Sequence, residues 1–236
     1  GGLWAHIPGE DVVIEDLTLS GASLTNHGQE GLVVMNGAEV TGLFVVTSEF
    51  LSNRVGLGIS AAGTVVADAS VMSSSFIANT LHGIQILAGA AVDGLLVDGS
   101  LFVLNGNEGI NVSGGAQVQN MTVQDSQFLL NKIGIGVTGA ATYLHGLTVE
   151  GSSFVEQQQH GIYIHGATVG ELEIRDSEFE SNGLQAVHIQ NATVDGATVS
   201  DSMFDSNRWG LLVRGSSNVT GLHVDGNVFS NHSETA

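Results

Sequence analysis

A single bulky apolar residue recurs along the chain at an almost constant spacing, and this repeat constrains the fold more than any other feature. The recurring residue is a leucine in the first copy and a phenylalanine in the next eight: Leu24, Phe50, Phe76, Phe102, Phe128, Phe154, Phe179, Phe204 and Phe229. Successive copies lie 26 residues apart five times and then 25 residues apart three times. A fixed period of this length is the signature of a protein built from stacked short units.

Two polar positions accompany the recurring phenylalanine. Serine stands two residues before it in most copies: Ser48, Ser74, Ser100, Ser126, Ser152, Ser177 and Ser202. Asparagine stands three residues after it: Asn53, Asn79, Asn105, Asn131, Asn182 and Asn207, with Gln157 in the remaining slot. Neighbouring strands lie about 4.8 Å apart, so asparagine side chains one copy apart are predicted to form a hydrogen-bonded ladder.

Each copy also contains two short segments in which apolar residues alternate with variable ones, as in residues 83–86 and 92–97. This period of two predicts strands with one buried face, and copies this short bury that face only by stacking. The inward row of the first strand is predicted to be Ile84, Ile110, Val137, Ile162 and Val187. The inward row of the second strand is predicted to be Val97, Val123, Val149, Ile174 and Val199.

The coil length, the asparagine ladder and the Gly-Ile-x-Ile phrase resemble the right-handed parallel β-helix of the pectate-lyase-like type. The resemblance extends from about residue 11 to residue 231, and it implies the handedness, because the spacing alone also permits the mirror winding. We therefore predict an all-β, single-stranded right-handed parallel β-helix of about 8–9 coils with 25–26 residues per coil. Residues 1–236 form one domain, with 1–10 as an N-terminal cap, 11–231 as coils and 232–236 as a tail.

The composition restricts the partners. The chain has 24 acidic and 5 basic residues, a formal net charge of −19, which repels the phosphates of nucleic acids and anionic lipid head groups. No apolar run approaches the roughly 18 residues of a membrane-spanning helix. We expect neither nucleic-acid binding nor membrane insertion. The expected partners are polysaccharides and further copies of this chain, in end-to-end or lateral assembly.

The histidines occupy slots of the repeat. His160 stands just before the strand glycine, in the slot that Glu30, His82, Glu108 and Gln185 fill in other copies. Alternation along the strand predicts that Tyr163, His165 and their counterparts on the next coils face outward, with His160 beside them on one exposed surface. An aromatic ring with polar neighbours along a groove suits glycan contact. The predicted glycan-binding set is His160, Tyr163, His165, His188, Gln190 and Arg214.

Three residues come nearest to a catalytic set, namely His82, Glu108 and His160. His82 and Glu108 share a slot on adjacent coils, where a carboxylate can orient an imidazole for proton transfer. His82 and His160 stand in His-Gly-Ile phrases similar to the Gly-His-Gly-Ile phrase of the polygalacturonase family. The carboxylates that this family places on neighbouring coils are missing here. Their positions hold Arg54, Val55, Lys132 and Ile133.

Acidic residues are concentrated between positions 171 and 205, which raises the question of a metal. Asp176 and Asp201 share a slot on adjacent coils, where like charges destabilise the fold unless something offsets them. Calcium, which takes about six to eight oxygen ligands, would offset them. Neither an Asp-x-Asp-x-Asp loop nor a Gly-Gly-x-Gly-x-Asp repeat is present. No other cofactor is predicted.

The regular repeat, the acidity and the incomplete catalytic set favour a non-catalytic β-solenoid that is extracellular or on the cell surface. Its predicted role is structural or adhesive, as a segment of a larger surface protein or fibre, with glycan contact. Large bacterial adhesins are similar in composition, which is an analogy at the level of the fold. The alternative is a carbohydrate-active enzyme, a polysaccharide lyase, epimerase or glycoside hydrolase, acting in a groove on the β-helix face.

Overall fold

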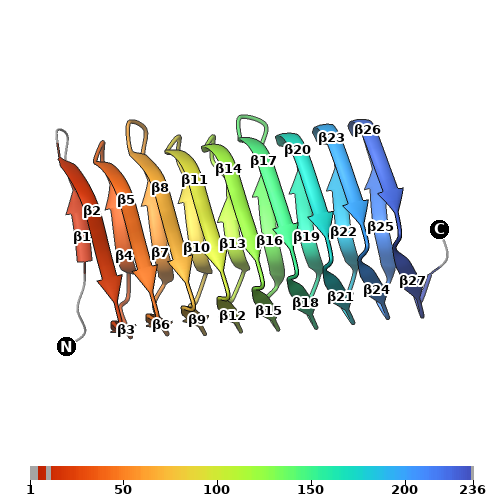
Figure 1. Cartoon of the computed structure of the whole chain (residues 1–236), viewed down its shortest axis with the longest axis horizontal. Coiled ribbons are helices and arrows are strands. Elements are labelled where there is room, and N and C mark those ends of the chain that lie inside the picture. The colour runs from red at the N-terminus through yellow and green to blue at the C-terminus, as the bar shows by residue number, and fades with distance from the viewer. Residues whose placement is uncertain (1–4, 9–11, 235–236) are drawn as a thin grey trace.

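The computed structural model describes residues 5–8 and 12–234, which form a right-handed parallel β-solenoid of about eight turns (Figure 1). Each turn adds one strand to each of three parallel sheets, and within the described residues every sheet has nine strands and no helix occurs. The predicted all-β parallel β-helix is therefore confirmed. Since the described residues contain no helix, none of their elements has the length and apolarity of a membrane-spanning helix.

Each coil passes through the three sheets in turn. The first sheet contains β1 (Ala5–Pro8), β4 (Glu30–Met35), β7 (Val55–Ser60), β10 (His82–Leu87), β13 (Glu108–Val112), β16 (Ile133–Thr138), β19 (His160–His165), β22 (Gln185–Gln190) and β25 (Trp209–Arg214). The second sheet contains β2 (Val13–Ser20), β5 (Glu39–Val46), β8 (Val65–Met72), β11 (Ala91–Asp98), β14 (Gln117–Gln124), β17 (Tyr143–Glu150), β20 (Thr168–Arg175), β23 (Thr193–Ser200) and β26 (Asn218–Asp225). The third sheet contains β3 (Ser23–Thr25), β6 (Glu49–Leu51), β9 (Ser75–Ile77), β12 (Leu101–Val103), β15 (Gln127–Leu129), β18 (Ser153–Val155), β21 (Glu178–Glu180), β24 (Met203–Asp205) and β27 (Val228–Ser230).

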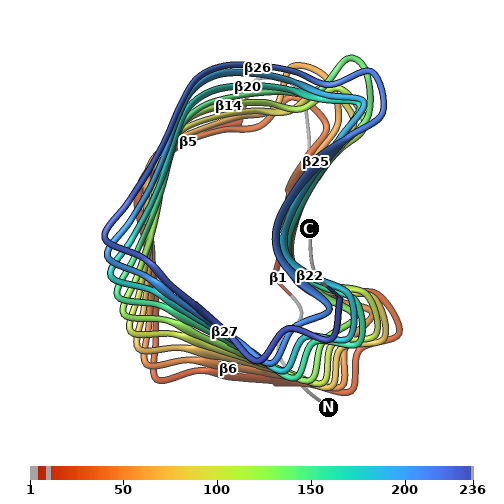
Figure 2. The same cartoon turned by 90° about the vertical axis from the view of Figure 1, so that its right-hand side faces the viewer.

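The three sheets differ in curvature. Seen end-on, the strands of the first sheet bow toward the core, and the long strands of the second sheet turn a corner on the opposite side (Figure 2). We call the outer surface of the first sheet the concave face. We call the outer surface of the second sheet around its corner the outer bend.

The corner of the second sheet lies at one position of the repeat, where the backbone has a positive φ. Glycine occupies this position in five coils and a polar residue in four, at Asp16, Gly42, Asp68, Gly94, Asn120, Gly146, Glu171, Gly196 and Gly221. Glycine adopts this left-handed conformation freely, and Asp and Asn tolerate it better than other residues. Because the chain turns there, one strand buries residues on both sides of the corner, such as Val92 and Val97.

The core is held by side-chain ladders that run along the rod. The recurring phenylalanines stack with ring centroids 4.6 to 5.0 Å apart, from Phe50 to Phe229. The predicted asparagine ladder is confirmed by buried hydrogen bonds between coils. For example, Asn105 Nδ2 donates to Asn131 Oδ1 at 2.9 Å and to the Phe76 carbonyl at 3.0 Å. The recurring serines form a second ladder, in which each hydroxyl accepts from the backbone N–H of its counterpart one coil earlier.

One predicted core row is wrong at one residue. The counterpart of Ile110 and Ile162 is Ile135, whereas Val137 belongs to the next inward row, beside Val112 and Ile164. The turn that follows Asn131 is one residue shorter than its neighbours, so counting from the phenylalanine overshoots the strand. The predicted row of the second strand, from Val97 to Val199, is confirmed.

The predicted N-terminal cap lies partly outside the described residues. Of residues 1–10, only Ala5–Pro8 are described, and they form β1, which pairs in parallel with β4. The described end of the predicted tail bonds back onto the preceding coil, where the Ser233 N–H donates to the Asn207 carbonyl at 3.1 Å.

We expect Asn105→Ala to lower the free energy of unfolding by about 2–4 kcal/mol, because it leaves buried donors and acceptors on two neighbouring coils unpaired. Asn218→Ala is the matched control, since Asn218 is exposed on β26 and its loss should cost less than about 0.5 kcal/mol. Urea denaturation followed by circular dichroism measures both. Equal losses in the two variants would contradict a stabilising role for the ladder.

Candidate functional site

The residues predicted to bind glycan lie together on the concave face. Strand pairing places Tyr163 beside His188 and His165 beside Gln190, and Gln190 beside Arg214. His160 pairs with Ile133 one coil earlier, in the predicted slot before the strand glycine. The predicted register of this face is therefore confirmed.

The prediction that these residues form an exposed surface is wrong for the two central histidines. His160 is 5% exposed and His188 is 4% exposed. The His160 ring lies 4.7 Å from that of Tyr163 and 4.9 Å from that of His188, measured between centroids. The strands bow inward here, so side chains that point away from the core converge and cover one another.

Burial controls the protonation of this cluster. It lowers the pKa of His160 to about 4, with a further lowering by His188. Burial also lowers the pKa of His188 to about 4, and the nearby charges of Arg214 and His165 add to the effect. Burial raises the pKa of Tyr163, whose hydroxyl donates to Gln190 Oε1 at 3.0 Å. At neutral pH both imidazoles are uncharged, and His160 Nδ1 and both ring nitrogens of His188 make no hydrogen bond.

The predicted pair of His82 and Glu108 is present on the same face, three coils closer to the N-terminus. His82 Nδ1 lies 2.8 Å from Glu108 Oε2, at ion-pair distance, although the oxygen is out of line for a hydrogen bond from the ring. The Glu108 side chain lies over Gly136, where an added Cβ would approach its Cγ to 2.9 Å. This pair has the elements of a proton-transfer dyad, an imidazole with a carboxylate beside it.

The two aspartates predicted to hold calcium lie one coil apart at exposed turns after β20 and β23. Asp176 Oδ2 is 3.8 Å from the Arg175 guanidinium, which offsets part of its charge. Within the described residues no group of three or more His, Cys, Asp or Glu side chains is arranged to hold a metal ion. Calcium at Asp176 and Asp201 stays a prediction.

The sequence reasoning missed a groove on the outer bend, which we call the outer-bend groove and define by Tyr143, His145, Gly170, Glu171 and Asp195. A hollow of about 500 Å³ lies among these residues, and a second hollow of about 380 Å³ adjoins it across Glu171. The groove crosses β17, β20 and β23. One signal in the sequence was available, because Gly170 interrupts an outward row that otherwise carries side chains.

Three parallel sheets wound into one right-handed solenoid define a right-handed parallel β-helix. The sequence matches the family described as "Right handed beta helix region" over residues 56–229, so the chain belongs to this family. No curated protein matches the chain.

Several solved structures are similar to the chain at low identity. The catalytic domain of Agl-KA is 13% identical with a TM-score of 0.49, and the match covers 94% of this chain and 44% of that domain. PfbA, a surface adhesin of Streptococcus pneumoniae, is 13% identical with a TM-score of 0.49, and the match covers 98% of this chain and 79% of the adhesin. Similarity at this level concerns the fold alone.

We expect the burial of His160 and His188 to make the protein less stable as the pH falls from about 6.5 to about 4. Below about pH 4 these two histidines should cause no further loss of stability. The unfolded chain protonates His160 and His188 below pH 6.5, whereas the folded chain resists protonation until about pH 4. Proton uptake in this window therefore favours unfolding. Urea midpoints at pH 7 and pH 5 measure the loss.

A variant of one histidine isolates the effect. His188→Leu, which matches Leu212 in the same row, should remove roughly half of the pH-dependent loss. His223→Gln, at an exposed position of β26, should leave the loss unchanged. The same loss in the wild type and in His188→Leu would contradict the assignment.

Proposed function

We propose that the chain is a rigid, non-catalytic β-helix of the extracellular space or cell surface, with a structural or adhesive role in which it binds glycan chains along its side. The observation that carries this proposal is the continuity of the buried ladders through successive coils. They hold outward rows at a constant spacing of about 4.8 Å per coil. A straight, regular surface of this kind suits a polymer that makes contact over several sugar units.

The charge of the protein limits which glycans it can bind. At a net charge of −19, the rod repels acidic polysaccharides at a distance and does not repel neutral ones. Neutral glycans are therefore the proposed direct ligands. Acidic glycans are expected to require a bridging cation such as calcium.

The state of the concave-face histidines supports a non-catalytic role. A general acid or base must come within hydrogen-bonding distance of the proton that it transfers. His160 and His188 are covered by each other and by Tyr163, so a substrate on this face meets the edge of the cluster. Rings covered in this way are not positioned to exchange a proton with a substrate.

We expect the protein to be retarded in native gels that contain at least one neutral polysaccharide, and to release neither unsaturated products nor new reducing ends from it. Parallel gels with calcium and with a chelator separate direct binding from bridging by a cation. A polysaccharide-free gel is the control. Turnover of any substrate would contradict the non-catalytic role, and retardation by none would contradict glycan binding.

A carbohydrate-active enzyme is the second candidate, and one observation favours it: the 2.8 Å approach of His82 Nδ1 to Glu108 Oε2. This pair could remove a proton from a sugar carbon in a lyase or epimerase reaction. If turnover is found, Glu108→Gln should reduce kcat by about 10²-fold or more, because it removes the charge beside the imidazole. His223→Gln should keep full activity, and equal rates for Glu108→Gln and the wild type would exclude the pair.

A further inference from the structure

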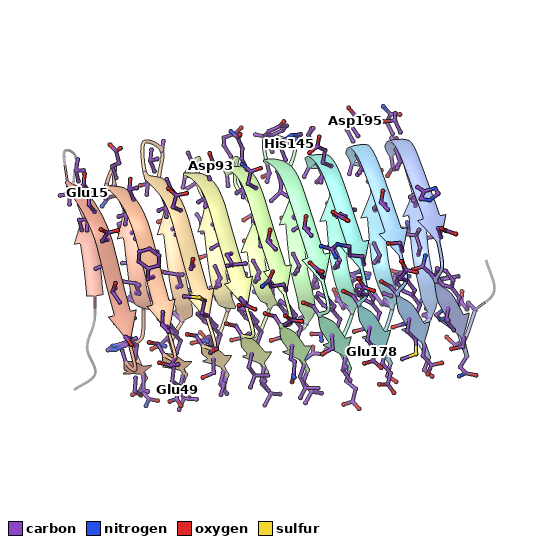
Figure 3. All side chains as sticks on the ribbon, viewed as in Figure 1. Glu15, Glu49, Asp93, His145, Glu178 and Asp195 are labelled. Atoms are coloured by element: carbon purple, nitrogen blue, oxygen red, sulfur yellow. The ribbon has the colours of Figure 1, made fainter. Side chains whose placement is uncertain are left out.

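We propose that Tyr143, His145 and Asp195 frame a binding subsite for one neutral hexopyranose ring in the outer-bend groove. The inference rests on the proposed function, because it states where the glycan is held. It places the contact on the second sheet, on a different face of the rod from the histidine cluster. Figure 3 shows His145 and Asp195 pointing outward along the same edge of the rod.

The hollow exists because one side chain is missing from a row. Strand pairing links His145, Gly170 and Asp195 as successive members of one outward row. The row runs Glu15, Thr41, Ala67, Asp93, Gln119, His145, Gly170, Asp195 and Thr220. Gly170 is its only glycine and has no positive φ, so the backbone does not require glycine there. A Cβ at Gly170 would lie 2.5 Å from His145 Nδ1, and its absence leaves room for that ring and for the hollow.

Two aromatic rings form one wall of the groove. Tyr143 is 37% exposed, and its ring lies 6.3 Å from that of His145 with only 6° between the two planes. A tyrosine offers a large, rigid contact surface at a low entropic cost. The apolar C–H face of a pyranose ring can pack against such a surface while its hydroxyl groups remain at the rim.

Carboxylates at the rim supply acceptors for those hydroxyl groups. The Glu171 side chain is 74% exposed and its Oε2 lies 3.6 Å from His145 Nε2, and Asp195 borders the far side of the hollow. A carboxylate accepts hydrogen bonds and donates none, so it pairs with sugar hydroxyls and repels a sugar carboxylate. The nearby Arg175 guanidinium is already engaged by Glu150 and Glu173. The groove is therefore suited to neutral sugars.

The size of the groove fits a short stretch of polymer. The first hollow, at about 500 Å³, lies within the range of roughly 300–1,000 Å³ that is typical of ligand sites. The second hollow continues across the corner, where Gly146 and Gly196 stand on either side of Glu171 and leave its flanks open. A chain bound at Tyr143 can therefore extend along the outer bend.

The composition of the protein permits a direct test, because it has only two tyrosines, one at each candidate surface. Tyrosine rings labelled with ¹³C give two sets of NMR signals, which Tyr143→Phe assigns to Tyr143 and Tyr163. Hexasaccharides of β-glucan, α-glucan, mannan and galactan are the probes. We expect one of them to shift the Tyr143 signals and to leave the Tyr163 signals in place.

Two substitutions test the Tyr143 surface and the hollow at Gly170. Tyr143→Ala, which has no Tyr143 signal and is therefore followed by gel retardation, should bind about tenfold more weakly, because it removes the stacking surface. Gly170→Gln should abolish the Tyr143 shifts, because the new side chain displaces the His145 ring and fills the hollow. The controls are Ala67→Gln, which introduces the same residue in the same row four coils away, and Tyr163→Phe on the concave face. Both should bind as the wild type does, and urea denaturation verifies that every variant is folded.

The outcomes distinguish the subsite from the proposed function. Shifts at Tyr163 alone, or wild-type binding by folded Gly170→Gln, overturn the subsite. Retardation by a polysaccharide whose hexasaccharide leaves Tyr143 unmoved also overturns the subsite, while glycan binding as the proposed function stands. Binding of no glycan in either the gels or the titrations overturns both.

Discussion

The fold depends on the in-register stacking of one coil on the next, and the buried asparagine ladder enforces that register. From Asn79 to Asn207, each carboxamide satisfies backbone groups of the preceding coil and also bonds the carboxamide of a neighbouring coil. The Asn105 Oδ1 atom, for instance, accepts from both the backbone N–H and the Nδ2 of Asn79. A slip of one residue would leave these groups unpaired in a dry core, at a cost of about 1–3 kcal/mol for each. The stacked phenylalanines fill the space beside the ladder and restrict the register further. Once the register is fixed, every outward residue has a known neighbour 24 to 27 positions away, so the surface follows from the core.

The curvature of each sheet then determines whether an outward row of side chains is covered or exposed. On the concave face, rows converge, and large side chains such as Tyr163 and His188 pack against each other until little space remains. On the outer bend, the strand turns a corner at Gly146 and its equivalents, and the rows on either side separate. Tyr143 remains exposed there for this reason. Two tyrosines on the outside of the same solenoid thus have different environments: Tyr163 is half-buried among neighbouring rings, and Tyr143 is exposed on the outer bend.

The repeat in the sequence was sufficient to predict the coil length, the ladder and the pairing of outward rows, because all three follow from spacing. It failed at Ile135 and Val137, where a turn shortened by one residue displaces the strand relative to the phenylalanine. It failed again for the exposure of His160 and His188, since alternation tells only which side of a strand a residue faces. Whether that side is open depends on the curvature of the sheet, and the curvature arises from three sheets packing around one core. The groove was missed for a related reason. The chain has 33 glycines, and Gly170 does not stand out among them until the outward row to which it belongs is known.

A solenoid of this kind can acquire a surface site without disturbing its core. Rows on the outside contribute little to the ladders, so a substitution in one coil changes the surface locally while the register stays fixed. On the concave face, rings such as those of His160 and Tyr163 fill the space between outward rows and leave a closed and uncharged patch. Removing a side chain from a row at the outer bend has the opposite effect, as at Gly170, and leaves a hollow bordered by the residues before and after it. The same repeat therefore provides both a closed face and an open groove, and the difference between them lies in a few outward side chains and in the curvature beneath them.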